Sequence, residues 1–186
     1  MRKRLPPLLA LVGCVVFSPC NANAQQTAPP APAFAIPQSG LSFSTGDTWV
    51  QNGQTIRLYG VQACLRGTSY TNPAGVKADC GEASLAYLAA IIRDTKPQCT
   101  PIAQVGAPPA ILVVCSARVG SSILDLATIM LTQGFTFASF TNDGKPVYMP
   151  YLVAELTAKK ARAGLWAASD LPHPVALLLQ AVQSRR

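Results

Sequence analysis

The chain has 186 residues, of which 49% are hydrophobic and only 12% are charged, and its formal net charge is +7. This length is typical of one domain with appendages, and the apolar fraction excludes a disordered chain. No apolar run reaches the roughly 18 residues that a membrane-spanning helix needs, so we expect no transmembrane span. One histidine and eight carboxylates are a poor supply for metal or acid–base chemistry, which disfavours a hydrolytic enzyme.

The first 24 residues have the pattern of an export signal. A basic start precedes the apolar stretch Leu8–Phe17, and Ala22-Asn23-Ala24 supplies a small-x-small cleavage site. A second interpretation makes Cys14 a lipidated N-terminus, because the four residues that end there (LVGC) resemble a bacterial lipobox. The apolar stretch continues past Cys14, which favours ordinary cleavage after Ala24. We therefore predict a periplasmic or secreted protein, with lipoprotein anchoring at Cys14 as the minor alternative.

Composition divides the rest of the chain into three parts. Residues 25–40 are rich in alanine and proline and are expected to form an extended tether. Residues 41–167 are expected to form one domain, and residues 168–186 a loop and a short amphipathic helix. Three of the 15 basic residues lie in the first four positions, so the chain without them carries only +4. That charge gives nucleic-acid binding weak support.

Strand patterns come first within the domain. The turn Asn52-Gly53 separates two alternating segments, Thr48–Val50 and Thr55–Val61, and this dipeptide is the strongest local signal of a hairpin. A short strand is expected over residues 41–43 and a buried strand over the apolar run 110–115. Residues 66–79 are expected to form a loop, and Pro97 and Pro101 to break the chain around Cys99.

Helical patterns follow the first strands. Apolar residues recur at helical spacing over residues 81–93, 123–133 and 151–163. Gly134 and Gly164 lie where the second and third of these segments should end. Strands first and helices interspersed afterwards predict an α+β domain.

Six short segments stand in an order that resembles a known family. They are Gly46-Asp47-Thr48, Ile56–Val61, the cysteines Cys80, Cys99 and Cys115, Met130–Phe135, the tyrosines 148 and 151 with Ala154-Glu155, and Ala161–Trp166. Together they resemble the staphylococcal nuclease-like (thermonuclease) domain from about Leu41 to Trp166. The resemblance implies an OB-type five-stranded β-barrel with three helices. It also implies a calcium-dependent phosphodiesterase, in which two aspartates hold the metal, a glutamate activates water and two arginines stabilise the phosphate.

Only part of that catalytic set is present. Asp47 and Arg57 match the second aspartate and the first arginine of the family. The first aspartate, a further acid, the glutamate and the second arginine are replaced by Thr45, Gln62, Leu65 and Ala110. Losing a general base costs about 10²–10⁴-fold in rate, and losing one electrostatic donor costs about 10²–10³-fold. The resemblance therefore implies a degenerate, non-catalytic member with no cofactor.

Two functions follow from this pattern. The first is an exported pseudoenzyme that acts as a binding or structural protein and meets a protein partner in the cell envelope. The alternative is a thermonuclease-type nuclease with residual calcium-dependent activity. Asp47 and Arg57 lie on neighbouring strands and should face one another. An ion pair closing a barrel end is favoured there over a remnant anion or metal site.

The cysteines indicate disulfides. If Cys14 and Cys20 leave with the signal, an even number remains in an oxidising compartment: Cys64, Cys80, Cys99 and Cys115. Their spacing offers no close pair of the kind that zinc sites use. We predict the pairs Cys64–Cys80 and Cys99–Cys115, each closing a loop of about 17 residues. The other pairings would have to cross between the two halves of the barrel.

Overall fold

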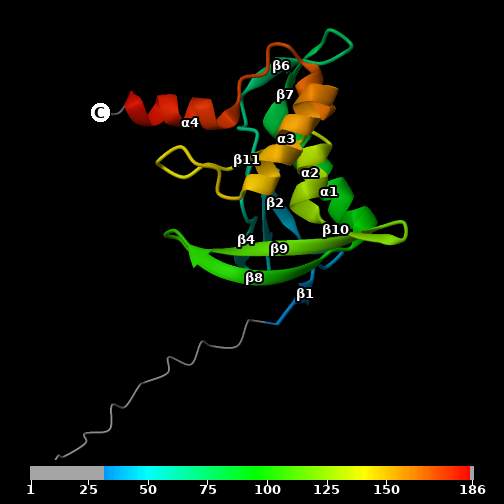
Figure 1. Ribbon diagram of the computed structural model, residues 1–186. Coiled ribbons are helices and arrows are strands. Elements are labelled where there is room, and N and C mark those ends of the chain that lie inside the picture. The colour runs from blue at the N-terminus through cyan, green and yellow to red at the C-terminus, as the bar shows by residue number, and fades with distance from the viewer. Residues whose placement is uncertain (1–31, 185–186) are drawn as a thin grey trace, which may run out of the picture.

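The computed structural model describes residues 32–184, which form a curled β-sheet with helices packed on it (Figure 1). The four α-helices of this range are α1 (Cys80–Thr95), α2 (Leu126–Thr132), α3 (Met149–Ala161) and α4 (Pro174–Gln183), with a 3₁₀ turn η1 at Gly164–Ala167. The strands are β1 (Phe34–Ala35), β2 (Ser42–Thr45), β3 (Thr48–Gln51), β4 (Gln54–Leu58), β5 (Val61–Ala63), β6 (Ser69–Thr71), β7 (Lys77–Asp79), β8 (Gln98–Val105), β9 (Ala110–Val119), β10 (Ser122–Asp125) and β11 (Thr136–Ala138).

Seven strands make up the main sheet. Their order is β1-β8-β9-β4-β3-β2, and β10 pairs with β9 outside this path. β4 and β9 run parallel, whereas the other paired strands are antiparallel. The remaining strands form two small sheets, β11-β5 and β6-β7. This curled, half-barrel arrangement confirms the predicted α+β class, while the five-stranded OB-type barrel with three helices stays a prediction.

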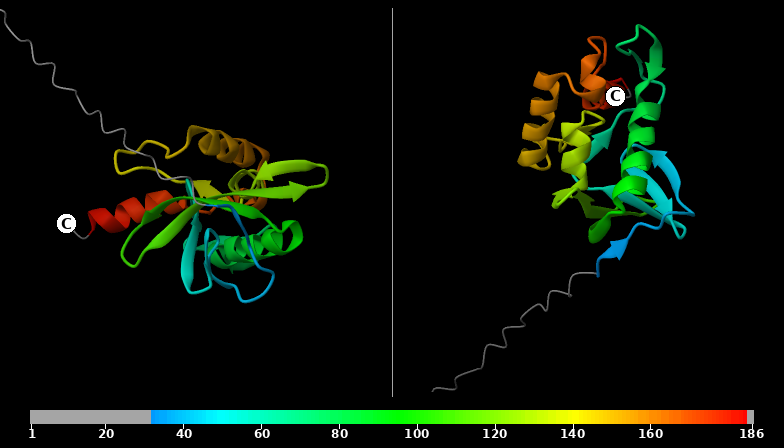
Figure 2. Two further views of the ribbon diagram at one scale, coloured as in Figure 1. Left: turned by 90° about the horizontal axis from the view of Figure 1, so that it is seen from below. Right: turned by 90° about the vertical axis from the view of Figure 1, so that its right-hand side faces the viewer.

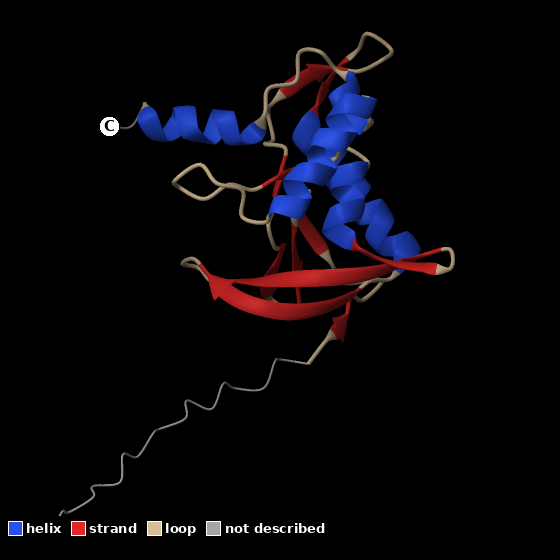
Figure 3. Cartoon of the chain, viewed as in Figure 1, coloured by secondary structure: helices blue, strands red, loops and turns tan. Residues whose placement is uncertain are grey.

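The core lies between the sheet and the helices. Figures 2 and 3 show α1, α2 and α3 on one side of the long strands β8 and β9, and α4 extending away from the body. The largest fully buried side chains of this core include Trp49, Leu58, Leu88 and Met130. Arg57 stands between two buried residues of β4, so its side chain leaves the core on the opposite face of the strand.

Both predicted disulfides are confirmed. One joins Cys64, just after β5, to Cys80 at the start of α1, with 5.6 Å between the Cα atoms. The other joins Cys99 and Cys115, which are directly paired across β8 and β9. All four cysteines are buried. Closing a loop of about 17 residues removes chain entropy from the unfolded state that is worth roughly 3 kcal/mol per bridge.

The helix predicted over residues 123–133 begins later than expected. Ser122–Asp125 form β10, which pairs with the second half of β9, and the helix α2 starts at Leu126. Asp125 ends the strand and caps the helix, because its side chain accepts a hydrogen bond from the Thr128 N–H group. The apolar pair Ile123 and Leu124 fits a strand as well as a helix, so periodicity alone could not separate the two.

Two other local predictions were wrong. The expected loop over residues 66–79 contains the hairpin β6-β7, whose turn is closed by the Asn72 side chain accepting two backbone N–H groups. Pro101 does not break the chain but lies within β8. The register of β8 on β9 shifts between Pro101 and Ala103. Proline is tolerated at such a bulge, because a bulge already interrupts the ladder of hydrogen bonds.

Ordered structure also starts earlier than Leu41. β1 pairs with β8, and Ile36 is only 3% exposed, so part of the predicted tether over residues 25–40 packs on the domain. The predicted signal over residues 1–24, with Cys14, lies outside the described residues. Within residues 32–184, no helix has the length and apolar character needed to cross a membrane.

Candidate functional site

The predicted pair Asp47 and Arg57 lies at one end of the sheet. Asp47 stands in the two-residue turn between β2 and β3, and Arg57 is the register partner of Thr48 across β3 and β4. Arg57 Nη2 lies 3.1 Å from Asp47 Oδ2. The predicted ion pair is therefore confirmed.

Both carboxylate oxygens of Asp47 are occupied by protein donors. Oδ1 accepts the hydroxyl groups of Thr45 and Thr48. Oδ2 accepts Arg57 Nε at 3.2 Å and the backbone N–H of Ala63 at 3.3 Å. The residue is 2% exposed. These contacts connect the β2–β3 turn to β4 and β5. The Asp47 carboxylate therefore has a structural role.

The neighbouring positions do not complete a metal site. The Gln62 side-chain oxygen accepts Arg57 Nη2 at 3.0 Å, and the Thr45 hydroxyl donates to Asp47. Leu65 and Ala110 carry no polar side chain. Calcium takes six to eight oxygen ligands, so this donor set does not fit the ion. In the described part of the chain, no three His, Cys, Asp or Glu side chains gather as metal ligands.

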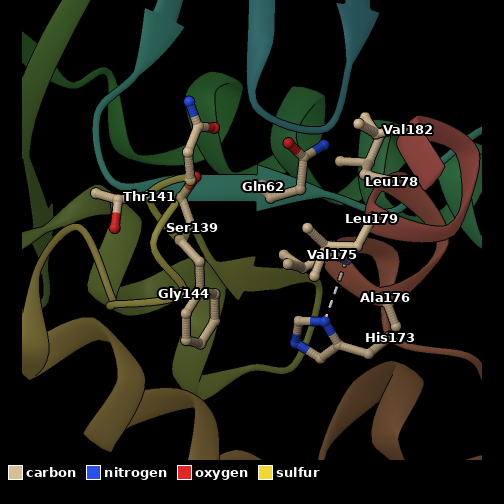
Figure 4. Close-up of a pocket in the computed structure, with 12 residues that line it drawn as sticks. Gln62, Ser139, Thr141, Gly144, His173, Val175, Ala176, Leu178, Leu179 and Val182 are labelled. Carbon is tan, nitrogen blue, oxygen red and sulfur yellow. Dashed lines mark hydrogen bonds between the residues drawn. The ribbon is translucent and has the colours of Figure 1, made fainter. Parts of the chain in front are cut away.

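A cavity of about 570 Å³ opens beside Gln62 (Figure 4). The apolar side chains of α4 line one wall and the loop after β11 lines the other, with Gln62 of β5 between them. The lining residues are Gln62, Ser139, Phe140, Thr141, Asn142, Gly144, His173, Val175, Ala176, Leu178, Leu179 and Val182. The polar part of this lining consists of amide and hydroxyl groups and the imidazole of His173, and none of these residues is a carboxylate.

His173 fixes the start of α4 at the edge of this cavity. Its Nδ1 accepts the Val175 N–H at 3.2 Å, drawn as the dashed line in Figure 4, and its Nε2 lies 2.9 Å from Glu155 Oε1. Since Nδ1 accepts, the ring proton sits on Nε2 and is donated to Glu155. Glu155 is buried and also accepts the Ala138 N–H at 2.6 Å.

The His173–Glu155 contact was missed from the sequence. Neither residue was predicted from the sequence to belong to a site. The two residues are 18 positions apart on separate elements, and no local pattern links them. Both ring nitrogens of His173 are engaged, so the cavity holds no free acid–base group among its lining residues. Its chemistry suits binding of apolar side chains.

We found no protein-family model that matches this sequence and no curated protein with significant similarity to it. The resemblance to the staphylococcal nuclease-like family therefore stays a prediction from the quoted segments.

Proposed function

We propose that the protein is an exported, non-catalytic module of the staphylococcal nuclease-like kind that acts as a binding or structural protein in the cell envelope. The supporting observation is the state of Asp47. Its two oxygens accept hydrogen bonds from Thr45, Thr48, Arg57 and Ala63 instead of facing open coordination positions. A calcium ion would have to break this network and would gain one carboxylate. Two disulfides also suit an oxidising compartment.

The surface that we assign to a protein partner is the wall of α4 that faces the cavity. Leu178, Leu179 and Val182 are 40%, 51% and 54% exposed, and the helix Pro174–Gln183 carries no charged residue. A helix with this much apolar surface is usually covered by another element. Helix-in-groove contact with a partner protein would cover it.

The catalytic half of the proposal is tested with a nuclease assay. Purified protein is incubated with plasmid DNA and with RNA, in calcium and in chelator. We expect no cleavage above the buffer control in either condition. Calcium-dependent cleavage that is lost both in chelator and in a folded Asp47→Asn variant would overturn the proposal in favour of the thermonuclease-type alternative.

The binding half is tested by crosslinking in cells. A photoreactive residue replaces Leu179 on α4, and a matched control replaces Val119, an exposed apolar residue at the end of β9. The connection between β9 and β10 lies on the opposite side of the molecule from α4 in Figure 1. We expect a discrete crosslinked envelope protein from position 179 and none from position 119. The same products, or no products, from both positions would contradict the assignment of α4.

A further inference from the structure

A second pocket, of about 370 Å³, is rich in tyrosine. Tyr59 follows β4, Asp125 ends β10, and Tyr148 and Tyr151 lie at the start of α3, so these four residues come from three separate segments. Its remaining lining residues are Val114, Thr128 and Pro150. We call it the tyrosine pocket.

The rings of Tyr148 and Tyr151 meet edge to face. Their centroids are 4.8 Å apart and their planes are at 85°, so they form two walls at nearly a right angle. Tyr151 is 4% exposed and forms the inner wall, whereas Tyr148 is 46% exposed at the mouth. Gly60, which has φ of +71°, makes this possible, because a Cβ there would lie 2.9 Å from the Tyr151 ring.

Asp125 brings a carboxylate to this pocket. Its Oδ1 accepts the N–H and the hydroxyl of Thr128, at 2.7 and 2.8 Å. Its Oδ2 is buried and has no hydrogen-bond partner among the described residues. None of the ion pairs found within residues 32–184 includes Asp125. Asp125 is partly buried, and a carboxylate without a counter-ion in such a place attracts a cation.

The Tyr151 phenol stays uncharged. Burial, followed by the negative charge of the nearby Asp125, raises the pKa of Tyr151 well above its usual value. Neutral aromatic rings have negatively polarised faces, which attract cations and repel anions. The ring faces and the Asp125 carboxylate therefore select for the same sign of ligand charge.

We infer that the tyrosine pocket binds an organic cation, namely the ammonium or guanidinium side chain of a lysine or arginine from a protein partner. The charged head would lie against the tyrosine faces near Asp125, and the alkyl stem against Val114 and Pro150. Tyrosine and carboxylate together supply what such cages use elsewhere, which is ring faces plus a counter-charge. The preference for a cation is argued from this pocket alone. The claim that the cation comes from a protein partner rests on the proposed function.

The experiment is a titration of the purified protein, followed through the tyrosine ring signals in NMR spectra. The probes are the acetylated and amidated forms of lysine, arginine and norleucine, the last being uncharged. We expect the two cations to shift the Tyr148 and Tyr151 signals with saturation in the millimolar range, and norleucine to leave them unchanged. Equal shifts from norleucine would overturn the proposal.

Variants place the binding in the pocket. Asp125→Asn keeps the oxygen that caps α2 and removes the charge, and Tyr148→Leu removes the exposed ring. Each should weaken lysine binding about fivefold or more. Tyr70→Leu, on β6 and outside the pocket lining, is the matched control and should bind unchanged. A folded Asp125→Asn variant that binds like the wild type would refute the role of the carboxylate.

A vesicle arm distinguishes the source of the cation. Vesicles of phosphatidylcholine offer a quaternary ammonium on a lipid headgroup. We expect no binding to them that depends on Asp125. Binding that Asp125→Asn abolishes, tighter than binding of the lysine and arginine probes, would overturn the protein source while leaving the cation preference. The nuclease assay does not involve this pocket, so its outcome is independent.

Discussion

Asp47 lies in the turn between β2 and β3, and Asp125 lies at the end of β10. Both carboxylates are withdrawn from water at least in part, but their partners differ. Asp47 accepts hydrogen bonds from Thr45, Thr48, Arg57 and Ala63 on both oxygens. Asp125 is engaged through Oδ1 alone, and its Oδ2 is left without a partner among the described residues. The family resemblance directs attention to Asp47, whereas the structure directs it to Asp125. The number of donors already present separates a structural carboxylate from one available to a ligand.

Each of the two aspartates has a disulfide beside it. The Ala63 N–H that contacts Asp47 belongs to the residue before Cys64. Asp125 is the register partner of Ser116, the residue after Cys115. Removing either disulfide therefore tests how far the structure around the neighbouring aspartate depends on that covalent link.

The largest effect is expected from the bridges. Replacing both cysteines of either bridge by alanine should lower the free energy of unfolding by about 3 kcal/mol, because each closes a loop of similar length. Urea unfolding of the two double variants measures this. The loss of Cys64–Cys80 should loosen the Asp47 region first, seen as faster amide exchange at Ala63. Peptide mapping without reductant that recovered a Cys64–Cys115 peptide would contradict the pairing.

Removing the Asp47 side chain should have the next largest effect. Asp47→Ala leaves the buried Ala63 N–H without its acceptor and Arg57 without its counter-ion. Since the Arg57 side chain is half-exposed and can regain water, we expect a loss of about 2–3 kcal/mol rather than the full cost of a buried charge. Urea unfolding measures this, with Asp47→Asn as the isosteric control. If Asp47→Ala lowered the free energy of unfolding no more than Asp125→Ala does, the comparison between the two aspartates would be contradicted.

Replacing Asp125 should change the free energy of unfolding less than replacing Asp47, and its two replacements should differ from each other. Asp125→Ala removes the cap of α2 and should cost about 1 kcal/mol. Asp125→Asn retains the capping oxygen, so the change in unfolding free energy should stay within about 0.5 kcal/mol. Thermal and urea unfolding of the pair would show this. Breaking a buried hydrogen-bond network costs about 2 kcal/mol or more. If Asp125→Asn lowered the free energy of unfolding by that much, Oδ2 would already have a hydrogen-bond donor, which would contradict the comparison.

Local chemistry predicted much of the fold. The hairpin around Asn52-Gly53, the helices α1 and α3 and both disulfides follow from turn residues, helical spacing and an even cysteine count. The errors lie where the same residues fit two structures: an apolar pair fits a helix or a strand, and a proline fits a chain break or a bulge. The sequence pattern favours a helix over β10 and a break at Pro101, but pairing with β9 decides both, and local periodicity does not show that pairing.

The candidate site divides in the same way. The Asp47–Arg57 pair was predictable because the two residues flank a short hairpin, and its two-residue turn defines the register of the strands. The tyrosine pocket was not, since Tyr59, Asp125 and Tyr148 come from three segments that only the folded chain brings together. The contact between His173 and Glu155 is non-local in the same sense.

The smallest expected effect extends the comparison to a third aspartate, Asp79, which caps α1 near the surface. Its carboxylate accepts the N–H groups of Gly67, Gly81 and Glu82. Burial acts to raise its pKa, but these hydrogen bonds outweigh that effect and hold the pKa below its usual value. Because the folded pKa is the lower one, the charged form stabilises the fold above about pH 4, and this contribution is lost as the pH falls through the folded pKa.

Asp79→Asn tests this sign directly. Asparagine still caps a helix, but its amide nitrogen cannot accept the Gly67 N–H in place of the second carboxylate oxygen. We expect the variant to be less stable by about 0.5 kcal/mol at pH 7, a small value because the carboxylate is close to solvent. The difference in unfolding free energy from the wild type should shrink between pH 4 and pH 2, as Asp79 becomes protonated. A difference that stayed constant over this range would show that Asp79 acts through its shape alone, as a neutral cap would.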